Sequence, residues 1–295
     1  MPGAKRKPGF LLLPPWWRLL LLASLLVLIL GTLTWGDSTM EQHFLYFPTK
    51  TLALTPQAVG LDYEDIFFTA EDGTRLHGWF IPAAEAAPTV LFFHGNAGNI
   101  GDRVDNLLAL HRFGLSVFIF DYRGYGQSAG VPSENGLYAD GRAARNWLRD
   151  HKPEAAGNLF YFGRSLGAAA ALQLALESPP RGLILESPFT SVAGMGKRHY
   201  PILYRLLGWL LNDKYDNNEK IKGLPVPLLL IYGTADTIVP PAMAQELFDL
   251  APQPKQLHLI DGADHNDIFF LGRESYWDAW RQFLQKGKKG KDELP

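Results

Sequence analysis

One serine of the chain has the surroundings of a nucleophile. Ser165 lies in the segment GRSLG, which matches the pattern G-x-S-x-G, between the apolar run NLFYF (158–162) and the strong helix former LGAAAALQLALE (166–177). A sharp turn from strand to helix would raise the serine hydroxyl above the edge of a sheet. The pattern alone arises easily by chance, and a serine in this place can also simply cap a helix. Because a serine hydroxyl is a poor nucleophile without a base, the rest of the chain decides between these interpretations.

A base and an acid follow Ser165 in the order that such a site requires. His265, in DGADHND, comes directly after the last apolar run. His258 lies within that run and is interpreted as a packed side chain, and the other six histidines come earlier in the chain. Asp236, in YGTADTIVP, lies at the end of the second-to-last apolar run, and its carboxylate could orient the imidazole of His265. Glu186, in LESPFTS, is the rival acid. The prediction is a Ser165–Asp236–His265 triad.

Two backbone amides are candidate donors to the oxyanion that forms when serine attacks a carbonyl. Leu166 follows the nucleophile at the start of a helix, where N–H groups are free. Asn96 lies in HGNAGN (94–99), a loop that could turn its amide inward, although a plain glycine turn is the alternative. Asp121, Asp264 and Asp267 are interpreted as residues that shape loops.

The same segments exclude several other chemistries. HGNAGN lacks the lysine and Ser/Thr of a phosphate-binding loop and does not match the dinucleotide fingerprint. The chain has no cysteine, so a thiol nucleophile, a disulfide and a cysteine metal site are excluded. No cofactor and no metal ion are expected.

The candidate residues follow short apolar runs that read as strands. Asp72-Gly73 is the turn signal of a β-hairpin within residues 61–81. Six runs follow, and they are apolar almost throughout, as strands buried on both faces of a parallel sheet must be; they are 89–95, 116–124, 158–165, 182–187, 227–236 and 256–262. Segments 104–113, 134–150 and 166–177 have the spacing of crossover helices. The expected fold is α/β, with an eight-stranded, mostly parallel sheet whose hairpin adds antiparallel strands at one edge.

The N-terminal region has the pattern of a membrane anchor. Residues 19–36 carry no charge, and at about 1.5 Å per residue they would span roughly the hydrocarbon core of a bilayer. Trp16, Trp17 and Trp35 flank the run, and the nearby basic residues precede it, which predicts a cytoplasmic N-terminus and a body on the outer side. A cleaved signal peptide and a core helix are the alternatives. KDEL at 291–294 is discounted as a retention signal because Pro295 follows it.

The expected organisation is one domain with appendages. A basic segment (1–18) precedes the anchor (19–36) and a linker (37–60), and the domain (61–285) precedes a basic tail (286–295). Without both basic ends the chain has 20 basic and 28 acidic residues, which argues against a nucleic-acid surface. The oligomeric state is not predicted.

An insertion at 192–223 precedes the seventh strand, and its centre, YPILYRLLGWLL, is apolar around most of a helix. It could cap the sheet and bury its leucines there. It could instead form an acyl-binding wall or touch a bilayer. The sequence does not choose between these interpretations.

The ordered motifs HGNAGN, DYRGYGQS, GRSLG, ESPFTS, GTADTIVP and GADHND resemble the α/β-hydrolase superfamily over residues 60–285. They resemble in particular its membrane-anchored serine hydrolases, which include depalmitoylating enzymes. The resemblance implies a sheet whose second strand is antiparallel, esterase chemistry without a cofactor, and the triad Ser165, Asp236 and His265. Depalmitoylating members often carry an N-terminal cysteine cluster, which this chain lacks.

The resulting expectation is a membrane-anchored serine hydrolase that cleaves a small-molecule or lipid ester or thioester. A serine aminopeptidase-like peptidase and an inactive binding or scaffold protein on the same fold are the alternatives.

Overall fold

The computed structural model describes residues 20, 23–24, 45–211 and 214–289. Its contacts divide the chain into two units, residues 1–43 and 44–295. In the first unit the three described residues are helical, and the hydroxyl of Ser24 donates to the carbonyl of Leu20 at 2.7 Å. No helix among the described residues is long and apolar enough to cross a membrane. The anchor expected at 19–36 lies outside the described residues except at those three positions.

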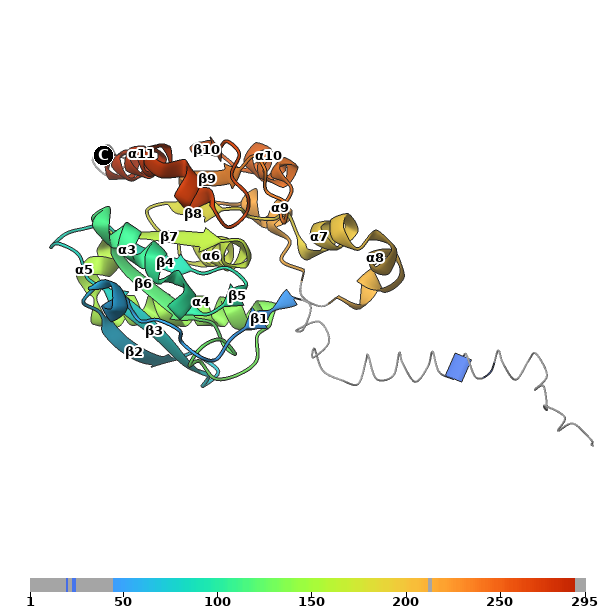
Figure 1. The fold of residues 1–295 in the computed structure, drawn as a ribbon, viewed down its shortest axis with the longest axis horizontal. Helices are drawn as coiled ribbons and strands as arrows, with labels where there is room; N and C mark the ends of the chain where they lie inside the picture. The colour runs from blue at the N-terminus through green and yellow to red at the C-terminus, as the bar shows by residue number, and fades with distance from the viewer. Residues whose placement is uncertain (1–19, 21–22, 25–44, 212–213, 290–295) are drawn as a thin grey trace, which may run out of the picture. The chain divides into compact units, whose positions relative to one another are not determined.

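An eight-stranded sheet forms the centre of the second unit (Figure 1). The strand order is β10-β9-β8-β7-β4-β6-β3-β2. The bounds are β2 (Glu64–Thr69), β3 (Arg75–Ile81), β4 (Thr89–Phe93), β6 (Ser116–Asp121), β7 (Leu159–Arg164), β8 (Leu183–Glu186), β9 (Leu228–Gly233) and β10 (Lys255–Ile260). The expected mostly parallel α/β sheet is confirmed.

Only one strand of this sheet runs against the others. β3 pairs antiparallel with both β2 and β6, while the remaining neighbours pair in parallel. The β2–β3 turn lies at Asp72-Gly73, where the φ of +83° at Gly73 suits glycine. The antiparallel second strand agrees with the resemblance, whereas β2, also expected to be antiparallel, runs with the rest.

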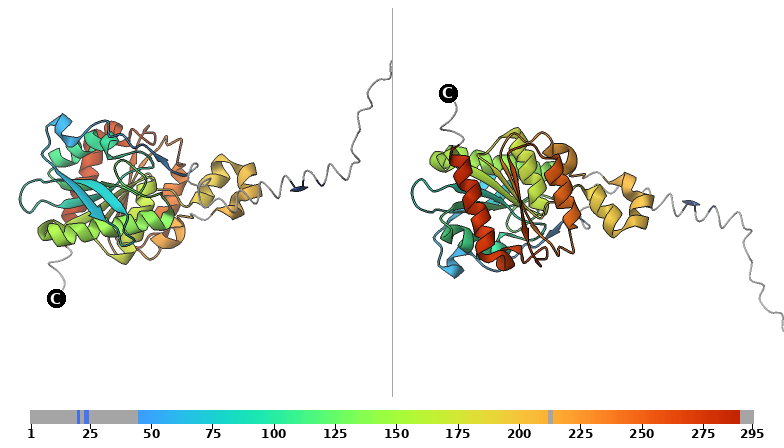
Figure 2. Two further views of the ribbon diagram at one scale, coloured as in Figure 1. Left: turned by 90° about the horizontal axis from the view of Figure 1, so that it is seen from below. Right: turned by 90° about the horizontal axis from the view of Figure 1, so that it is seen from above.

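Helices cover both faces of the sheet (Figure 2). Residues of α4 (Glu134–His151), α6 (Leu166–Glu177), α9 (Asn217–Ile221) and α10 (Pro241–Leu250) pack in one apolar cluster. Residues of α3 (Val104–Arg112) and α11 (Ile268–Lys289) pack in another. Successive strand residues alternate between the clusters: Leu91 and Phe93 join the first, and Val90 and Phe92 the second. This double burial explains why the strands are apolar throughout.

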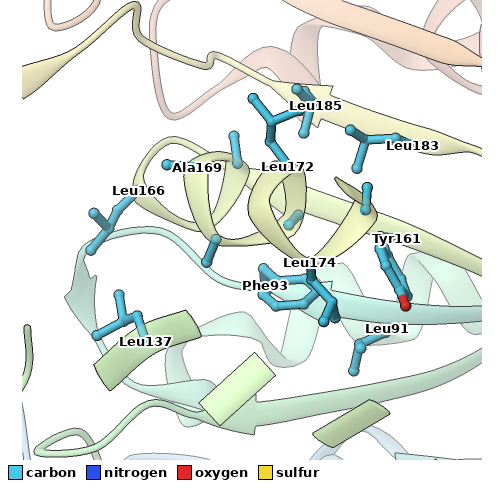
Figure 3. Packing of buried hydrophobic residues seen from close by; sticks show 14 of the residues in the cluster. Leu91, Phe93, Leu137, Tyr161, Leu166, Ala169, Leu172, Leu174, Leu183 and Leu185 are labelled. Carbon is cyan, nitrogen blue, oxygen red and sulfur yellow. The ribbon is translucent and has the colours of Figure 1, made fainter. Parts of the chain in front are cut away.

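Helix α6 lies close against the centre of the sheet because its inner face is made of alanines (Figure 3). Ala168, Ala169 and Ala171 are almost fully buried, and the larger Leu172 and Leu174 extend among the side chains of β4, β7 and β8. Small side chains allow a close approach of backbone to backbone. The helix that begins beside Ser165 is therefore held firmly on the strand that precedes it.

The remaining elements connect or flank this body. They are β1 (Phe47–Pro48), η1 (Pro56–Val59), β5 (Ala97–Gly98), η2 (Ile100–Arg103), α5 (Pro153–Gly157), α7 (Val192–His199), α8 (Pro201–Leu207) and η3 (Gly208–Leu210). The linker expected to reach residue 60 differs from the structure, because β1 pairs with β5 and Asn99 donates to both Thr49 and Thr51. A two-residue pairing leaves no periodic pattern in a sequence, so its partner could not be predicted.

Candidate active site

The candidate catalytic residues come from loops that follow four adjacent strands. Ser165 follows β7, Ser187 follows β8, Asp236 follows β9 and His265 follows β10. Ligands of open parallel sheets bind beyond the carboxyl ends of the strands. Because these four strands are neighbours in the sheet and run in parallel, their following loops bring these residues to one edge.

Ser165 occupies a strained turn. Its φ of +51° and ψ of −115° lie where a side chain costs about 1–3 kcal/mol, and the helix α6 starts at the next residue. A Cβ at Gly163 would lie 2.5 Å from the carbonyl oxygen of Gly167, and a Cβ at Gly167 would lie 2.1 Å from that of Phe93. Both positions therefore exclude any other residue without a backbone shift. The two glycines of the motif make the turn possible.

The two predicted oxyanion donors lie on either side of this turn. A Cβ at Gly95, next to Asn96, would lie 3.9 Å from the Cβ of Ser165, so the HGNAGN loop runs beside the serine. Within residues 45–211 and 214–289, the amides of Asn96 and Leu166 donate to no protein acceptor. Free N–H groups beside a nucleophile are the donors that a developing oxyanion needs.

Asp236 and His265 are in direct contact. Nδ1 of His265 lies 2.8 Å from Oδ2 of Asp236, and both side chains are buried. The hydroxyl of Ser187 donates to the same oxygen at 3.0 Å, while the amides of Ile238 and Val239 donate to Oδ1 at 2.9 and 2.7 Å. Four donors fix the carboxylate, so the carboxylate in turn fixes the imidazole with its proton on Nδ1.

The loops that carry the acid and the base are joined along their length. The amide of Ala235 donates to the carbonyl of Ala263 at 2.9 Å, and a Cβ at Gly233 would lie 2.2 Å from that oxygen. Asp264 accepts hydrogen bonds from the amides of Thr237 and His265, both at 2.7 Å. Asp264 thus shapes the loop.

The rival acid Glu186 is occupied elsewhere. It is buried, its Oε2 accepts from the hydroxyl of Tyr276 at 2.7 Å, and Nε of Arg164 lies 2.5 Å from Oε1. Its backbone carbonyl accepts from the amide of Ser165 at 2.9 Å. Glu186 therefore supports the turn and does not contact the imidazole.

Ser165 and His265 do not yet share a hydrogen bond. In the part of the chain that the structure describes, neither the Ser165 hydroxyl nor Nε2 of His265 has a protein partner. Nucleophile–base contacts are often long in structures without a substrate. The free Nε2 is the atom that could receive a proton.

A buried cluster of titratable side chains lies under the HGNAGN loop. Asp121 accepts from the amide of Ile100 at 3.0 Å, and its two oxygens lie 3.7 Å from ring nitrogens of His77 and His94. Burial raises the pKa of Asp121 and lowers that of His94 to about 3, with the charge of Arg103 also lowering the latter. The pKa of His77 is raised despite its burial, because Asp121 and Asp65 favour its charged form. His94 stays neutral, with Nδ1 donating to the carbonyl of Gly95.

Sequence reasoning missed two residues of this region. Ser187 donates to Asp236, and the hydroxyl of Tyr125 donates to the side-chain oxygen of Asn96 at 3.0 Å. Ser187 directly follows β8. The triad candidates were identified because they also follow strands, so the same criterion could have identified Ser187. Tyr125 had no comparable signal, because its role depends on how the DYRGYGQS loop folds over HGNAGN.

Over residues 45–211 and 214–289, no three His, Asp or Glu side chains form a group that could hold a metal ion. The geometry instead has the parts of nucleophilic catalysis.

Comparison with known proteins gives the relationship of the whole chain. Residues 84–224 match the family described as serine aminopeptidase, S33. An alpha/beta hydrolase domain-containing protein of Arabidopsis thaliana, WAV2, is 33% identical over 271 residues, with 83% of this chain and 88% of that protein covered. The chain belongs to the α/β-hydrolase superfamily.

Other relatives of this α/β hydrolase include proteins without a described function. An uncharacterized protein of Mycobacterium tuberculosis is 41% identical, covering 86% of this chain and 89% of its own. An uncharacterized membrane protein of Saccharomyces cerevisiae is 35% identical, covering 79% and 84%. Among solved structures, an esterase of Pyrococcus furiosus, Pf2001, is similar with a TM-score of 0.69 and 23% identity, covering 82% of this chain and 97% of that one. That likeness confirms the α/β-hydrolase fold.

Proposed function

We propose that this α/β hydrolase is a membrane-anchored serine hydrolase that cleaves carboxylic esters or thioesters through an acyl-enzyme on Ser165. The observation that carries the proposal is the 2.8 Å contact of His265 with a carboxylate held by three further donors, at the sheet edge where Ser165 occupies a strained turn. The arrangement leaves Nε2 of the imidazole unpaired and two amides free.

In the first half of the reaction, Nε2 of His265 takes the proton from the Ser165 hydroxyl as its oxygen attacks the carbonyl carbon. The carbonyl oxygen becomes an oxyanion, which the amides of Asn96 and Leu166 stabilise. Asp236 stabilises the imidazolium. The imidazolium gives its proton to the leaving alcohol or thiol as the bond to the acyl carbon breaks.

In the second half, water replaces the leaving group. His265 takes a proton from the water as the oxygen attacks the acyl carbon, and the Ser165 oxygen leaves with that proton. The carboxylic acid is released and the free enzyme returns. No cofactor takes part in this scheme.

The first test uses a fluorophosphonate probe, which reacts covalently with an activated serine. The full-length protein should be labelled and should hydrolyse p-nitrophenyl esters, whereas Ser165→Ala should lose the label and at least about 10³-fold in turnover. Equal behaviour of both proteins across acyl lengths would refute the proposal. A wild-type protein that resists the probe would support the alternative of an inactive scaffold.

A peptidase is the second candidate, because the matching family is described as serine aminopeptidase. Aminoacyl amides and esters with the same acyl group distinguish the two reactions. Faster hydrolysis of the amides would favour the peptidase. A palmitoyl-cysteine peptide tests the depalmitoylating branch, for which the missing cysteine cluster is unfavourable.

The proposed anchor is residues 19–36, with the N-terminus in the cytoplasm and the catalytic domain on the outer side. Its support is the uncharged run and the basic residues before it. Protease added to right-side-out membrane vesicles should digest the catalytic domain. Digestion only in inside-out vesicles would reverse the topology, and release by alkaline carbonate would refute the anchor.

A further inference from the structure

The insertion before β9 forms a helical hairpin whose apolar side chains face solvent. The insertion hairpin comprises α7, α8 and η3, residues 192–210. Figures 1 and 2 show α7 and α8 extending away from the layered body. Six of the 15 large hydrophobic side chains that are exposed in the described residues lie within it, although it is a short part of the chain: Tyr200, Ile202, Leu203, Leu206, Leu207 and Trp209.

The exposure of these side chains is large. Ile202 is 77% exposed, Trp209 71%, Tyr200 66% and Leu206 65%. Single exposed leucines are normal on a protein surface, but a contiguous group marks a site of interaction. Of the alternatives left open by the sequence, burial of the leucines on the sheet does not hold for Leu203, Leu206 and Leu207, which are exposed.

The hairpin does not need its outer apolar residues to hold its own fold. Tyr204 fills the space between its helices, since a Cβ at Gly196 or Gly208 would lie 2.8 and 2.7 Å from the Tyr204 ring. The amide of Val192 donates to the carbonyl of Lys214 at 3.0 Å and closes the base. The exposed side chains are thus free for a partner.

The charges of the hairpin indicate which partner. Residues 192–211 contain Lys197, Arg198 and Arg205 but no Asp or Glu, in a chain whose net charge is −2. All three cations are exposed, and none of them forms an ion pair with a described residue. Exposed cations without an ion-pair partner among the described residues, beside exposed leucines and with tyrosine and tryptophan between them, suit the interface of a bilayer that carries anionic headgroups.

We propose that the insertion hairpin docks on an anionic phospholipid surface, with Ile202, Leu206 and Trp209 among the acyl chains and Lys197, Arg198 and Arg205 against the headgroups. The proposal adds a membrane contact made by the catalytic unit itself, separate from the N-terminal run. It does not depend on chemistry at Ser165.

The hairpin lies next to the candidate active site. Nε2 of His199, the last residue of α7, donates to the carbonyl of Ile238 at 2.8 Å. Ile238 is in the loop whose amides hold Asp236. A docked hairpin would thus hold the site near the lipid surface, where esters with long acyl chains are concentrated.

The absence of cysteine allows a direct test with single labels. In the full-length protein, Ile202→Cys is labelled with a polarity-sensitive fluorophore. The control is Leu259→Cys on β10, where the replaced leucine is 50% exposed. Each protein is reconstituted with phosphatidylcholine vesicles, with or without phosphatidylglycerol, that carry nitroxide-labelled acyl chains. Both positions are exposed, so both variants should fold, which circular dichroism checks.

In the anionic vesicles, the fluorescence emission of the label at residue 202 should shift to the blue and be quenched by the nitroxides. The label at residue 259 should show neither effect. Replacing Arg198 and Arg205 with glutamine should lower the equilibrium constant for docking, obtained from quenching against phosphatidylglycerol content, by about fivefold for each charge. A label that stays in water would overturn the proposal. A blue shift without nitroxide quenching would also overturn it, because a second copy or another segment of the chain would then cover the hairpin. Equal quenching without phosphatidylglycerol would refute the role of the cations.

Discussion

Replacing Asp236 with asparagine separates the geometry of the proposed site from its electrostatics. An asparagine can keep Oδ1 as the acceptor for the amides of Ile238 and Val239. Its NH₂ group would then replace Oδ2, which now accepts from Nδ1 of His265. Because two donors cannot face each other, Nδ1 must become the acceptor and the ring proton must move to Nε2. An imidazole protonated at Nε2 cannot take the proton of Ser165.

The expected loss of activity is therefore large, and the loss of stability is moderate. A wrong histidine tautomer costs about 10⁴-fold in kcat in a serine triad. Each of the four hydrogen bonds to Asp236 loses its charge assistance, about 0.5–1 kcal/mol each, so the free energy of unfolding should fall by about 2–4 kcal/mol. A domain of this size should still be folded at 25 °C.

The assay is hydrolysis of p-nitrophenyl butyrate by the full-length protein in detergent, together with the rate of fluorophosphonate labelling and a urea unfolding curve. Glu186→Gln is the matched control, since Glu186 is a buried carboxylate at the next strand that binds Arg164 and Tyr276 instead. It should keep kcat within about tenfold, because it leaves the tautomer of His265 unchanged. If Asp236→Asn stayed within tenfold of wild type, or Glu186→Gln fell as far, the assignment of the acid would be refuted.

Three further substitutions test the surrounding structure. Gly167→Ala places a methyl group against two backbone oxygens, so it should lower the free energy of unfolding by about 1–3 kcal/mol and slow labelling by the fluorophosphonate probe. The control Gly157→Ala has open space around it and should do neither. Equal effects of the two substitutions would contradict the close backbone approach at Gly167. Burial lowers the pKa of His94 from 6.5 to about 3, so between these pH values the unfolded chain binds more protons than the folded chain, and the free energy of unfolding falls as the pH falls. His94→Asn should flatten this pH dependence in urea titrations at stepped pH. An unchanged dependence of the free energy of unfolding on pH would contradict the prediction. Arg123→Lys keeps the charge but removes the fork by which Nε and Nη2 both donate to buried Asp140. It should cost about 1–3 kcal/mol in the same urea assay, and an unchanged free energy of unfolding would contradict the role of the fork.

The sequence predicted those parts of the molecule that have a local signature. Strands buried on both faces are apolar throughout, so β4, β6, β7, β8 and β9 could be recognised from runs such as TVLFF and LILE. Asp236 and His265 could be paired from the sequence because each follows a strand, and the ends of neighbouring parallel strands meet. The sharp turn expected at Ser165 is confirmed by the close backbone contacts of its two flanking glycines.

The parts that sequence could not give depend on contacts between distant segments. The hydroxyl of Tyr125 reaches the side-chain oxygen of Asn96 across 29 residues, because the DYRGYGQS loop lies beside HGNAGN. Tyr46 lies 2.7 Å from Tyr215, hydroxyl to hydroxyl, across 169 residues, and no pattern in either segment indicates the other. The insertion hairpin is apolar in the same way as a buried helix, and only its position in space shows that its leucines face outward.

Ile238 is a common neighbour of the insertion hairpin and of the candidate acid Asp236. Its carbonyl accepts from His199 of the insertion hairpin, and the amide of Val239, which is in the same peptide group as that carbonyl, donates to Oδ1 of Asp236. A shift of the hairpin on docking would therefore change a peptide group that holds the carboxylate. Linkage between two sites is reciprocal in free energy. If docking raises the affinity of the site for a transition-state analogue by some factor, occupation of the site must raise the affinity for the lipid surface by the same factor. The protein would then remain longer on membranes that carry its substrate.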